Sequence, residues 1–358
     1  MPATSSSPPS EPTPTRLPSP LPICSQPATV GLDEMELAFV AEWGGNNEIY
    51  EIRGDGAGLR RITTNLAHEA GPVWSPDGRQ IAFQVLAGAN AMTFTSQLHV
   101  VMADGSGDRG LAPDLTAFGV EWSPNGEQIF VGAYDGLYSV RVDSGKATRV
   151  TRGSAGPLSP DGRLVAFAVD ASPDDRTDRL FIVNIDGTGL KEVGALQDYR
   201  ISGIAWRPHT DEILLTLEAP NRSPALYSVT LDGTVTKLPV SSDYPPRDPR
   251  WSPDGTVLAY TRHTYGTAPQ GEAIFLTTLY VATPDGEFDA AMVEPPADVE
   301  TDFSIPEFVW APDGRHIAYT TSTEGRVDLL VLNVCDGTSS LVVEDIGFYS
   351  DPSWRPLP

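Results

Sequence analysis

The sequence has few basic residues and no long apolar run, and both shortages exclude classes of function. Lys and Arg number 24 against 48 Asp and Glu, so the formal net charge at pH 7 is −24. Nucleic acids and anionic membrane surfaces bind proteins that present a dense basic surface, so the composition argues against both partners. No apolar run approaches the ~18 residues that a membrane-spanning helix requires, and the sequence therefore predicts no membrane span.

Cysteine and histidine are scarce as well. The two cysteines, Cys24 and Cys335, are too few for a disulfide framework. A single bridge between them is one alternative, but two unrelated thiols are the interpretation that the sequence favours. The five histidines form neither a His-Glu-x-x-His motif nor a Cys-His cluster, so the sequence predicts no metal site and no cofactor.

Glycine and proline are instead abundant, with 33 residues of each among 358. This usage disfavours long helices, while a hydrophobic content of 40% still supplies a large core. We therefore expect an ordered, turn-rich, all-β protein.

The first 30 residues differ in composition from the rest of the chain. Nine prolines and nine Ser or Thr residues occur within residues 1–27, without the basic start and apolar segment of a signal peptide. Such a stretch buries too little apolar surface to offset its ordering entropy, so we expect a disordered spacer over residues 1–30 and one domain over 31–358. Spacers of this kind often separate an exported domain from a membrane anchor, which suggests a periplasmic, extracellular or cell-surface location.

A short motif recurs through the expected domain. Its clean form is Trp-Ser-Pro-Asp-Gly, and successive copies begin 36 to 59 residues apart. This spacing suits the four-stranded blade of a β-propeller, whose repeat is typically ~40–50 residues. The seven copies begin at Trp74, Trp122, Leu158, Trp206, Trp251, Trp310 and Trp354.

Each unit is interpreted as four short strands. An apolar strand ends at the Trp, and Pro-Asp-Gly then forms a tight turn, because Pro sets φ, Asp bonds to the backbone and Gly accepts a positive φ. A β-rich run such as Ile81–Phe83 follows, and a third strand such as Leu180–Val183 ends in a second turn that contains Asp. An Asp-Gly pair between two β runs is a strong hairpin signal. A fourth, more polar strand completes the unit.

The two ends of the repeat array complement each other. The first unit begins at Glu36–Val40 and lacks its inner strand, whereas Asp351–Trp354 supplies one more inner strand near the C-terminus. Pairing them would close the ring and cover strand edges that an open array leaves exposed. We therefore predict a seven-bladed β-propeller with circular closure, with six or eight blades as alternatives.

The unit Trp-Ser-Pro-Asp-Gly-x-x-Ile-Ala-Phe resembles the repeat of TolB-type (WD40-like) β-propellers over residues 31–358. It is also similar to the N-terminal propellers of prolyl oligopeptidase relatives such as dipeptidyl peptidase IV. The motif consists of turn and core positions, so the resemblance implies a fold rather than a function. TolB itself resembles a six-bladed propeller preceded by a small α/β domain, and the seven units and the spacer found here depart from that pattern.

The sequence offers little support for enzymatic chemistry. No Gly-x-Ser-x-Gly pentapeptide occurs, so a serine hydrolase is not expected. The oxygens of Asp104–Asp108 have a spacing that suits calcium, but the segment lacks the later bidentate Glu of an EF-hand loop and is better explained as a hairpin turn. Metal-dependent oligogalacturonate lyases resemble seven-bladed propellers of this repeat type and use a central His-containing site. Because His68 is expected near the ring axis, such a lyase or a carbohydrate-binding propeller is the alternative function.

The main prediction is a non-catalytic, monomeric scaffold that binds a protein or peptide, or else a glycan, at the rim of the central channel. The rim loops join one blade's outer strand to the next blade's inner strand, and here they mix aromatic, Arg and acidic residues that suit recognition. A solvated rim with structural aromatics is the competing explanation. Long loops at 87–96, 170–178 and 262–277 are expected on the same face. The candidate rim residues are His68, Glu69, Phe118, Tyr199, Arg200, Tyr244, Arg247, Asp248, Glu307, Tyr349 and Asp351.

Overall fold

The structure is a computed structural model that describes residues 21–25, 28, 30–87, 95–152, 156–170, 178–196, 199–219, 222–240, 246–347 and 350–357. In these residues the chain forms strands and two short 3₁₀ helices, η1 (Pro22–Ser25) and η2 (Leu32–Glu34), so the all-β prediction is confirmed. Within the described ranges, none of the helices has the length and apolar character needed to cross a membrane.

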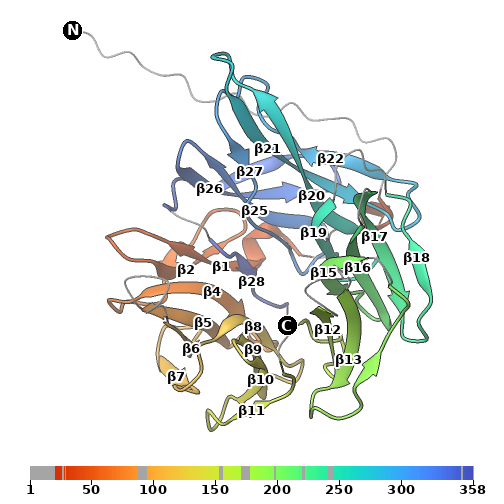
Figure 1. Cartoon of the computed structure of the whole chain (residues 1–358). Coiled ribbons are helices and arrows are strands. Elements are labelled where there is room, and N and C mark those ends of the chain that lie inside the picture. Colours follow the sequence, from red (N-terminus) through yellow and green to blue (C-terminus); the bar gives the residue numbers. More distant parts are fainter. Residues whose placement is uncertain are drawn as a thin grey trace.

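The strands form antiparallel sheets that succeed one another around the centre of the molecule (Figure 1). The first sheet has the order β28 (Ser353–Trp354), β1 (Glu36–Ala41), β2 (Glu48–Arg53) and β3 (Arg60–Arg61). The second contains β4 (His68–Trp74), β5 (Gln80–Ala87), β6 (Thr95–Met102) and β7 (Arg109–Leu111). The third contains β8 (Phe118–Trp122), β9 (Gln128–Ala133), β10 (Gly136–Arg141) and β11 (Ala147–Arg149).

The next two sheets repeat this pattern. The fourth contains β12 (Leu164–Asp170), β13 (Asp178–Asn184) and β14 (Lys191–Glu192), and an isolated bridge joins Leu158 to Val165 where the other sheets have a first strand. The fifth contains β15 (Arg200–Trp206), β16 (Glu212–Ala219), β17 (Arg222–Thr230) and β18 (Val235–Lys237).

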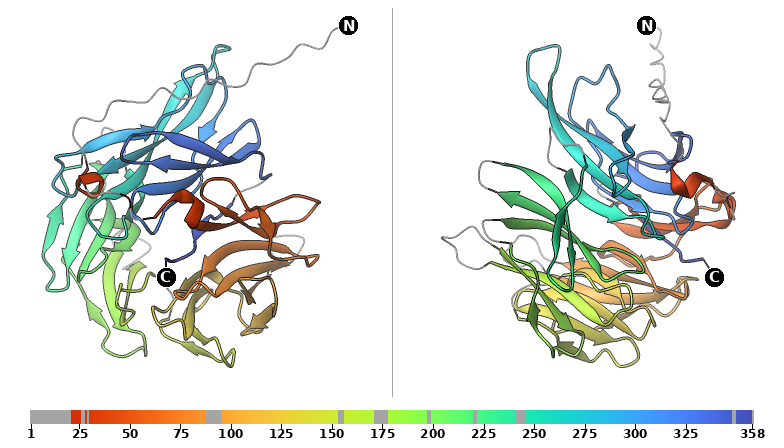
Figure 2. Two further views of the ribbon diagram at one scale, coloured as in Figure 1. Left: turned by 180° about the vertical axis from the view of Figure 1, so that it is seen from behind. Right: turned by 90° about the vertical axis from the view of Figure 1, so that its right-hand side faces the viewer.

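The last sheet is larger, because a short strand joins two groups of four strands. The first group is β19 (Pro246–Trp251), β20 (Leu258–Thr267), β21 (Ala273–Ala282) and β22 (Asp289–Val293). The second group is β24 (Phe308–Trp310), β25 (His316–Thr323), β26 (Arg326–Asn333) and β27 (Ser339–Val343). Between them β23 (Phe303–Ser304) pairs in parallel with β21 and antiparallel with β25. The hairpin of β20 and β21 projects beyond its neighbours in every view (Figures 1 and 2).

The C-terminal strand pairs with the first strand of the chain. In this pairing Leu37 lies opposite Trp354 and Ala38 opposite Ser353. The backbone N–H of Arg355 donates to the carbonyl of Glu36 at 2.8 Å, and the two side chains also form an ion pair. Residues from both ends of the chain therefore share one sheet.

The recurrent turns have the hydrogen bonds that their residue types predict. In the first copy the Ser75 hydroxyl donates to Asp77 at 2.7 Å and accepts the N–H of Gln80 at 2.9 Å, while Gly78 has a φ of +65°. The hydrogen bond from Ser75 is the main reason that the pKa of Asp77 lies below its usual value. The repeated Asp residues thus shape backbone turns, as the sequence indicates.

The motif tryptophans pack between successive sheets. The indole N–H of Trp122 donates to the Val73 carbonyl of the preceding sheet at 3.0 Å, and Trp310 donates to the Arg250 carbonyl at 3.1 Å. Where Arg replaces the Ser of the motif, its guanidinium lies over the Trp of the next sheet instead: Arg207 lies 4.7 Å from the ring centre of Trp251. Both contacts link neighbouring sheets, and a buried Trp contributes a large apolar area to each interface.

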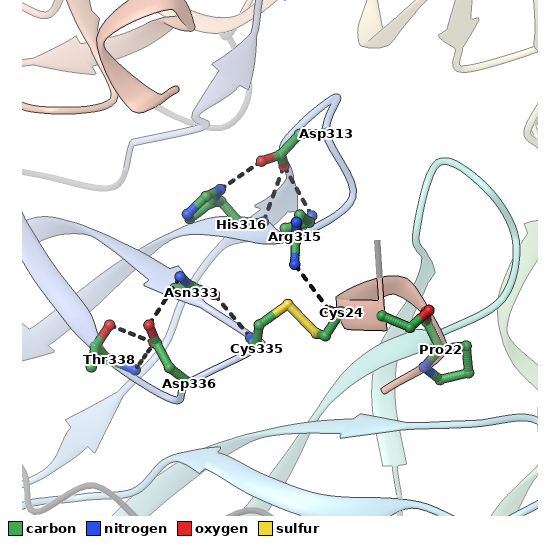
Figure 3. The surroundings of a disulfide bond; sticks show 10 residues. Pro22, Cys24, Asp313, Arg315, His316, Asn333, Cys335, Asp336 and Thr338 are labelled. Atoms are coloured by element: carbon green, nitrogen blue, oxygen red, sulfur yellow. Dashed lines mark hydrogen bonds and ion pairs between the residues drawn. A yellow bond between two sulfur atoms is a disulfide. The ribbon is translucent and has the colours of Figure 1, made fainter. Parts of the chain in front are cut away.

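The N-terminal segment corrects two expectations. Cys24 and Cys335 form a disulfide bond rather than remaining unrelated thiols (Figure 3). Residues 21–25 are also not part of a disordered spacer, because Leu21 is 1% exposed and packs with Ile23 into the core of the last sheet. Apolar burial and the covalent bond offset the ordering entropy of this short segment. Residues 1–20 lie outside the described residues.

Candidate functional site

Six strands that end at a motif Trp carry the predicted rim residues near their beginnings. These Trp-bearing strands are β4, β8, β15, β19, β24 and β28. Of the eleven candidates, Tyr244 and Tyr349 lie outside the described residues. Each of the other nine lies either within the first half of a Trp-bearing strand or just before that strand begins. The topology therefore places all nine at the end of the sheet where its Trp-bearing strand starts.

A backbone irregularity recurs at this end of the strands. The pairing of β4, β8, β15 and β19 with the following strand shifts by a bulge a few residues before the Trp. Three residues before the Trp, Gly71, Gly119 and Asp248 have φ values of +58°, +68° and +49°. Bulges of this kind re-aim side chains at the ends of strands and are frequent next to functional sites. We refer to the position three residues before the Trp as the bulge column; its described members are Gly71, Gly119, Gly203, Asp248, Glu307 and Asp351.

Three members of the bulge column are acidic. Asp248 lies on β19, Glu307 directly precedes β24 and Asp351 lies two residues before β28; we call these three residues the acidic arc. Burial is the main reason that the pKa of Glu307 is raised, while Arg250 lowers it and the charges of Asp351 and Asp248 raise it further. The charges of Asp351 and Asp248 therefore act on Glu307.

The arc has one direct basic partner. Arg250 donates to the Glu307 carboxylate at 3.0 Å and lies over the ring of Phe308. Asp351 accepts the backbone N–H of Gly71 at 3.1 Å, and burial raises its pKa. Within the described part of the chain, neither Asp248 nor Asp351 forms an ion pair with an arginine. Two of the three carboxylates therefore keep their capacity to bind a cation.

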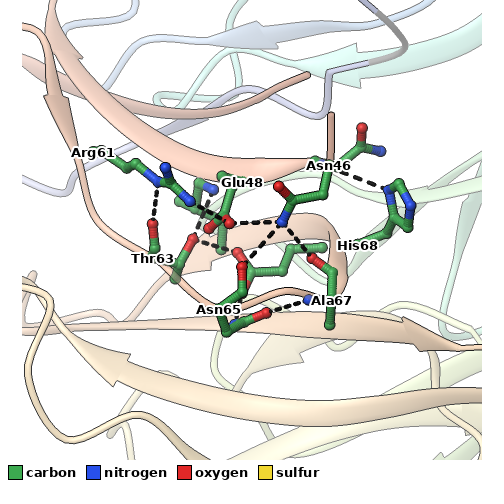
Figure 4. Close-up of polar contacts among 10 residues, drawn as sticks. Asn46, Glu48, Arg61, Thr63, Asn65, Ala67 and His68 are labelled. Carbon is green, nitrogen blue, oxygen red and sulfur yellow. Dashed lines mark hydrogen bonds and ion pairs between the residues drawn. The ribbon is translucent and has the colours of Figure 1, made fainter. Parts of the chain in front are cut away.

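His68 lies beside the loop that precedes β2 (Figure 4), and Glu69 is hydrogen-bonded to the segment that precedes β4. The backbone N–H of Asn47 donates to Nδ1 of His68 at 3.3 Å. Glu69 is fully buried, and its carboxylate accepts hydrogen bonds from Thr63 and Asn65. Burial raises the pKa of Glu69 to about 7 despite these hydrogen bonds. Glu69 is therefore a structural group rather than a rim residue.

The neighbouring carboxylate Glu48 is fully buried as well. It accepts a hydrogen bond from Asn46 at 2.7 Å and pairs with Arg61. Asn46 also donates to the carbonyls of Asn65 and Ala67, so this network fixes the loop that precedes β4.

The two described aromatic candidates differ in exposure. Phe118 is 37% exposed and meets the exposed Tyr134 edge to face, with 4.8 Å between the ring centres. Tyr199 contacts Tyr227 at 5.7 Å and packs against the core of the fifth sheet. Besides His68, the exposed candidates among the described residues are therefore Phe118 and three charged residues, Arg200, Arg247 and Asp248.

Arg250 on β19 and Glu121 on β8 lie on Trp-bearing strands but are not among the residues predicted from the sequence. Glu121 on β8 accepts the backbone N–H of Leu158 at 3.1 Å, and burial raises its pKa to about 7. Both residues directly precede a motif Trp. Aligning the seven motifs on their Trp would have identified this column and the bulge column.

The charged side chains at the strand ends are suited to binding charged groups. In the described residues, no group of three or more His, Cys, Asp or Glu side chains is arranged to hold a metal ion. His68 stands beside backbone and amide partners, without a cluster of carboxylates positioned as further ligands. What the strand ends do provide is a set of carboxylates beside exposed arginines.

Comparisons with known proteins identify similar sequences and folds. A family model described as the TolB beta propeller domain matches residues 23–210. The Tol-Pal system protein TolB of Francisella tularensis is 26% identical over 255 residues, which cover 66% of this chain and 53% of that protein. The chain therefore spans about half the length of these curated relatives.

Solved structures show the same architecture at low sequence identity. TolB from Acinetobacter baumannii has a TM-score of 0.53 and 14% identity, and the match covers 91% of this chain and 68% of that one. An oligogalacturonate lyase in complex with manganese has a TM-score of 0.62 and 14% identity, with coverage of 86% and 84%. At these identities the similarity establishes the fold alone.

Proposed function

Because the chain belongs to the TolB β-propeller family, we propose that it is a non-catalytic scaffold that binds a protein or peptide partner at the ends of its Trp-bearing strands. The acidic arc is the observation that carries this proposal. It gathers three carboxylates from strands that are far apart in the sequence, and two of them have no arginine partner among the described residues.

The chemistry of the arc favours a partner segment that carries Lys or Arg. A net charge of −24 steers cationic segments toward the molecule over several ångströms, and local carboxylates then select among them. Arg250 and the exposed Arg247 add donors that bind backbone carbonyls or an acidic neighbour in the partner.

We also propose that the protein acts in the envelope of a bacterial cell or on its surface. The disulfide between Cys24 and Cys335 supports this location, because such bonds persist in oxidising compartments and are rare in the cytosol of most organisms. The relatives named Tol-Pal system protein TolB support it as well.

For the architecture, we propose a closed seven-bladed ring. Each of the seven motif copies is associated with one group of strands, and the pairing of β28 with β1 gives the first group its inner strand. The β23 strand joins the sixth and seventh groups into one sheet without removing the four strands of either group.

The binding proposal is tested with two labelled peptides of equal length, one with four Lys residues and one with four Glu residues in a Gly-Ser background. We expect the Lys peptide to bind, with an affinity that falls steeply with salt, and the Glu peptide not to bind. The double variant Asp248→Asn/Asp351→Asn should weaken the Lys peptide by about 10-fold at low salt.

The matched control is Asp186→Asn/Asp232→Asn, which removes the same charge from two exposed hairpin turns. These two carboxylates accept local backbone N–H groups, a function that an Asn oxygen preserves. Equal losses in the two double variants would show that only the net charge matters and would refute a site at the arc. Intact chain and arc variant can then be compared as baits in envelope extracts, where the partner should be captured by the first and not by the second.

A further inference from the structure

A second candidate site shares no lining residue with the arc and lies where the long β20–β21 hairpin meets the last group of strands. The hairpin extends past its neighbour β19. The pairing of β19 with β20 ends at Pro246 and Arg262. The pairing of β20 with β21 continues beyond that point and includes Tyr265 and Phe275. On the other side of the hairpin β23 pairs with β21 and β25. A cavity of about 520 Å³ is formed here, within the size range of ligand pockets.

The cavity has a specific chemical lining. It combines one aromatic ring, three hydroxyl groups and two carboxylates, and no basic side chain lines it; the lining residues are Phe275, Thr301, Asp302, Ser304, Ser322, Glu324 and Gly325. One oxygen of Asp302 accepts the backbone N–H of Phe275 at 2.7 Å, which fixes the carboxylate beside the ring. His263 and Tyr265 support Phe275 through edge-to-face contacts with centre distances of 4.7 and 6.0 Å.

One feature of the lining is not explained by folding alone. The hydroxyl oxygen of Thr301 is buried and has no hydrogen-bond partner among the described residues, which is unfavourable for a buried polar atom. Glu324 and Gly325 form the two-residue loop between β25 and β26, and their φ values of +54° and +80° are those that a tight hairpin requires. The hairpin thus places the exposed Glu324 at the cavity.

From this lining we infer a binding site for a neutral saccharide of about two sugar rings. The C–H face of a pyranose ring would pack on Phe275, while neighbouring hydroxyls would donate to the Asp302 and Glu324 carboxylates and exchange hydrogen bonds with Ser304 and Ser322. A ligand hydroxyl would also supply the missing partner of Thr301. Two carboxylates without a basic side chain disfavour an anionic sugar such as a uronate.

This inference is independent of the proposed peptide site, because the lining contains no residue of the acidic arc. It is tested by ligand-observed NMR on the full chain with cellobiose, maltose and N,N′-diacetylchitobiose, with digalacturonate as the anionic comparison. We expect at least one neutral disaccharide to bind with a Kd of about 1 mM, and digalacturonate to bind at least about 10-fold more weakly.

Two variants locate the site. Phe275→Ala should weaken the disaccharide by about 10-fold, and Tyr134→Ala, which removes another exposed ring 74% accessible to solvent, should leave binding unchanged. If Phe275→Ala does not fold, Ser322→Ala serves instead, because the Ser322 hydroxyl forms no side-chain hydrogen bond among the described residues; this variant should weaken binding by about 3-fold. The inference is overturned if none of the neutral disaccharides binds, if digalacturonate binds as well as they do, or if a folded Phe275 or Ser322 variant binds like the unaltered chain.

Discussion

Breaking the Cys24–Cys335 bond should destabilise the whole domain, not only the N-terminal segment. The bond closes a loop with a sequence separation of 311 residues, and the chain-entropy relation gives about 6 kcal/mol for a loop of this length. Measured contributions are usually smaller, near 2–4 kcal/mol, so we take ~4 kcal/mol as the expected loss. For 358 residues, an unfolding entropy of ~2.1 cal/mol/K per residue amounts to about 0.75 kcal/mol/K, and the Tm should therefore fall by about 5 °C.

The assay compares thermal and denaturant unfolding of the oxidised chain with Cys24→Ser/Cys335→Ser. Alkylation and mass measurement first establish that the bond is present in the purified chain. Reductant should lower the Tm of the unaltered chain to that of the double variant and should not change the variant itself. If the double variant has the same Tm as the oxidised chain, the bond does not stabilise the domain by constraining its unfolded state.

A second variant separates the covalent contribution from packing. Leu21 is 1% exposed and belongs to the core cluster that contains Val257, Leu279 and Val334. Leu21→Ala should cost about 2–5 kcal/mol through the cavity that it leaves, and it should do so with the disulfide intact. If neither the double Cys variant nor Leu21→Ala lowers the Tm, but both increase proteolysis near residue 25, then the domain is stable without its N-terminal segment.

Three further predictions follow from the same structure. Burial raises the pKa of Glu121 to about 7, well above its unfolded value near 4.5, so the folded state binds the extra proton and stability falls as pH rises through 7. Glu121→Gln keeps the acceptor for the Leu158 N–H but cannot ionise. Between pH 5 and pH 8, the free energy of unfolding of this variant in denaturant titrations should fall by about 2 kcal/mol less than that of the unaltered chain. The exposed control Glu127→Gln should show the same pH dependence as the unaltered chain. Trp354 is 6% exposed and packs in a core cluster with Leu37 and Phe39, so Trp354→Ala should cost about 3–5 kcal/mol in the same titrations; an unchanged Tm would contradict the pairing of β28 with β1. We expect elemental analysis to find no stoichiometric metal and oligogalacturonate to remain uncleaved, while metal binding that is lost in His68→Ala would favour the lyase alternative.

The regular part of the fold could be predicted from the sequence because it depends on local rules. Pro, Asp and Gly specify each turn through φ, a side-chain acceptor and a positive φ, and the structure shows these roles at Ser75–Gly78. The motif Trp marks a buried strand end in six of the seven units, and Leu158 takes its place in the other. Seven repetitions of one local rule made the all-β class and the strand order predictable.

The contacts that the sequence did not predict join distant residues. Nothing near Cys24 indicates that Cys335 lies beside it, because 311 residues separate them and only the tertiary fold brings them together. The interval of 59 residues between Trp251 and Trp310 did contain a signal. It is the longest spacing of the array, and the structure uses the additional residues to form β23 and part of the saccharide cavity.

The candidate site was predicted in part, for a related reason. Loop position placed Asp248, Glu307 and Asp351 near the starts of Trp-bearing strands, but it could not separate them from Glu69, which is fully buried and accepts hydrogen bonds from Thr63 and Asn65. Distinguishing accessible from buried acids requires the register of each strand, and a bulge changes that register by one residue.

Backbone conformation explains the residue type at some positions of the bulge column and not at others. At Gly71, Gly119 and Asp248 the positive φ favours Gly or Asp, so the residue type follows from conformation. Glu307 and Asp351 have no positive φ, and burial raises the pKa of both, so their ionised carboxylates are electrostatically unfavourable where they stand. At Glu307 the ion pair with Arg250 offsets this cost, whereas Asp351 forms no ion pair among the described residues. Asn at position 351 could still accept the Gly71 N–H, so that hydrogen bond does not require a carboxylate. We propose that a cationic ligand neutralises Asp351, which is the reason to look for the partner at the acidic arc.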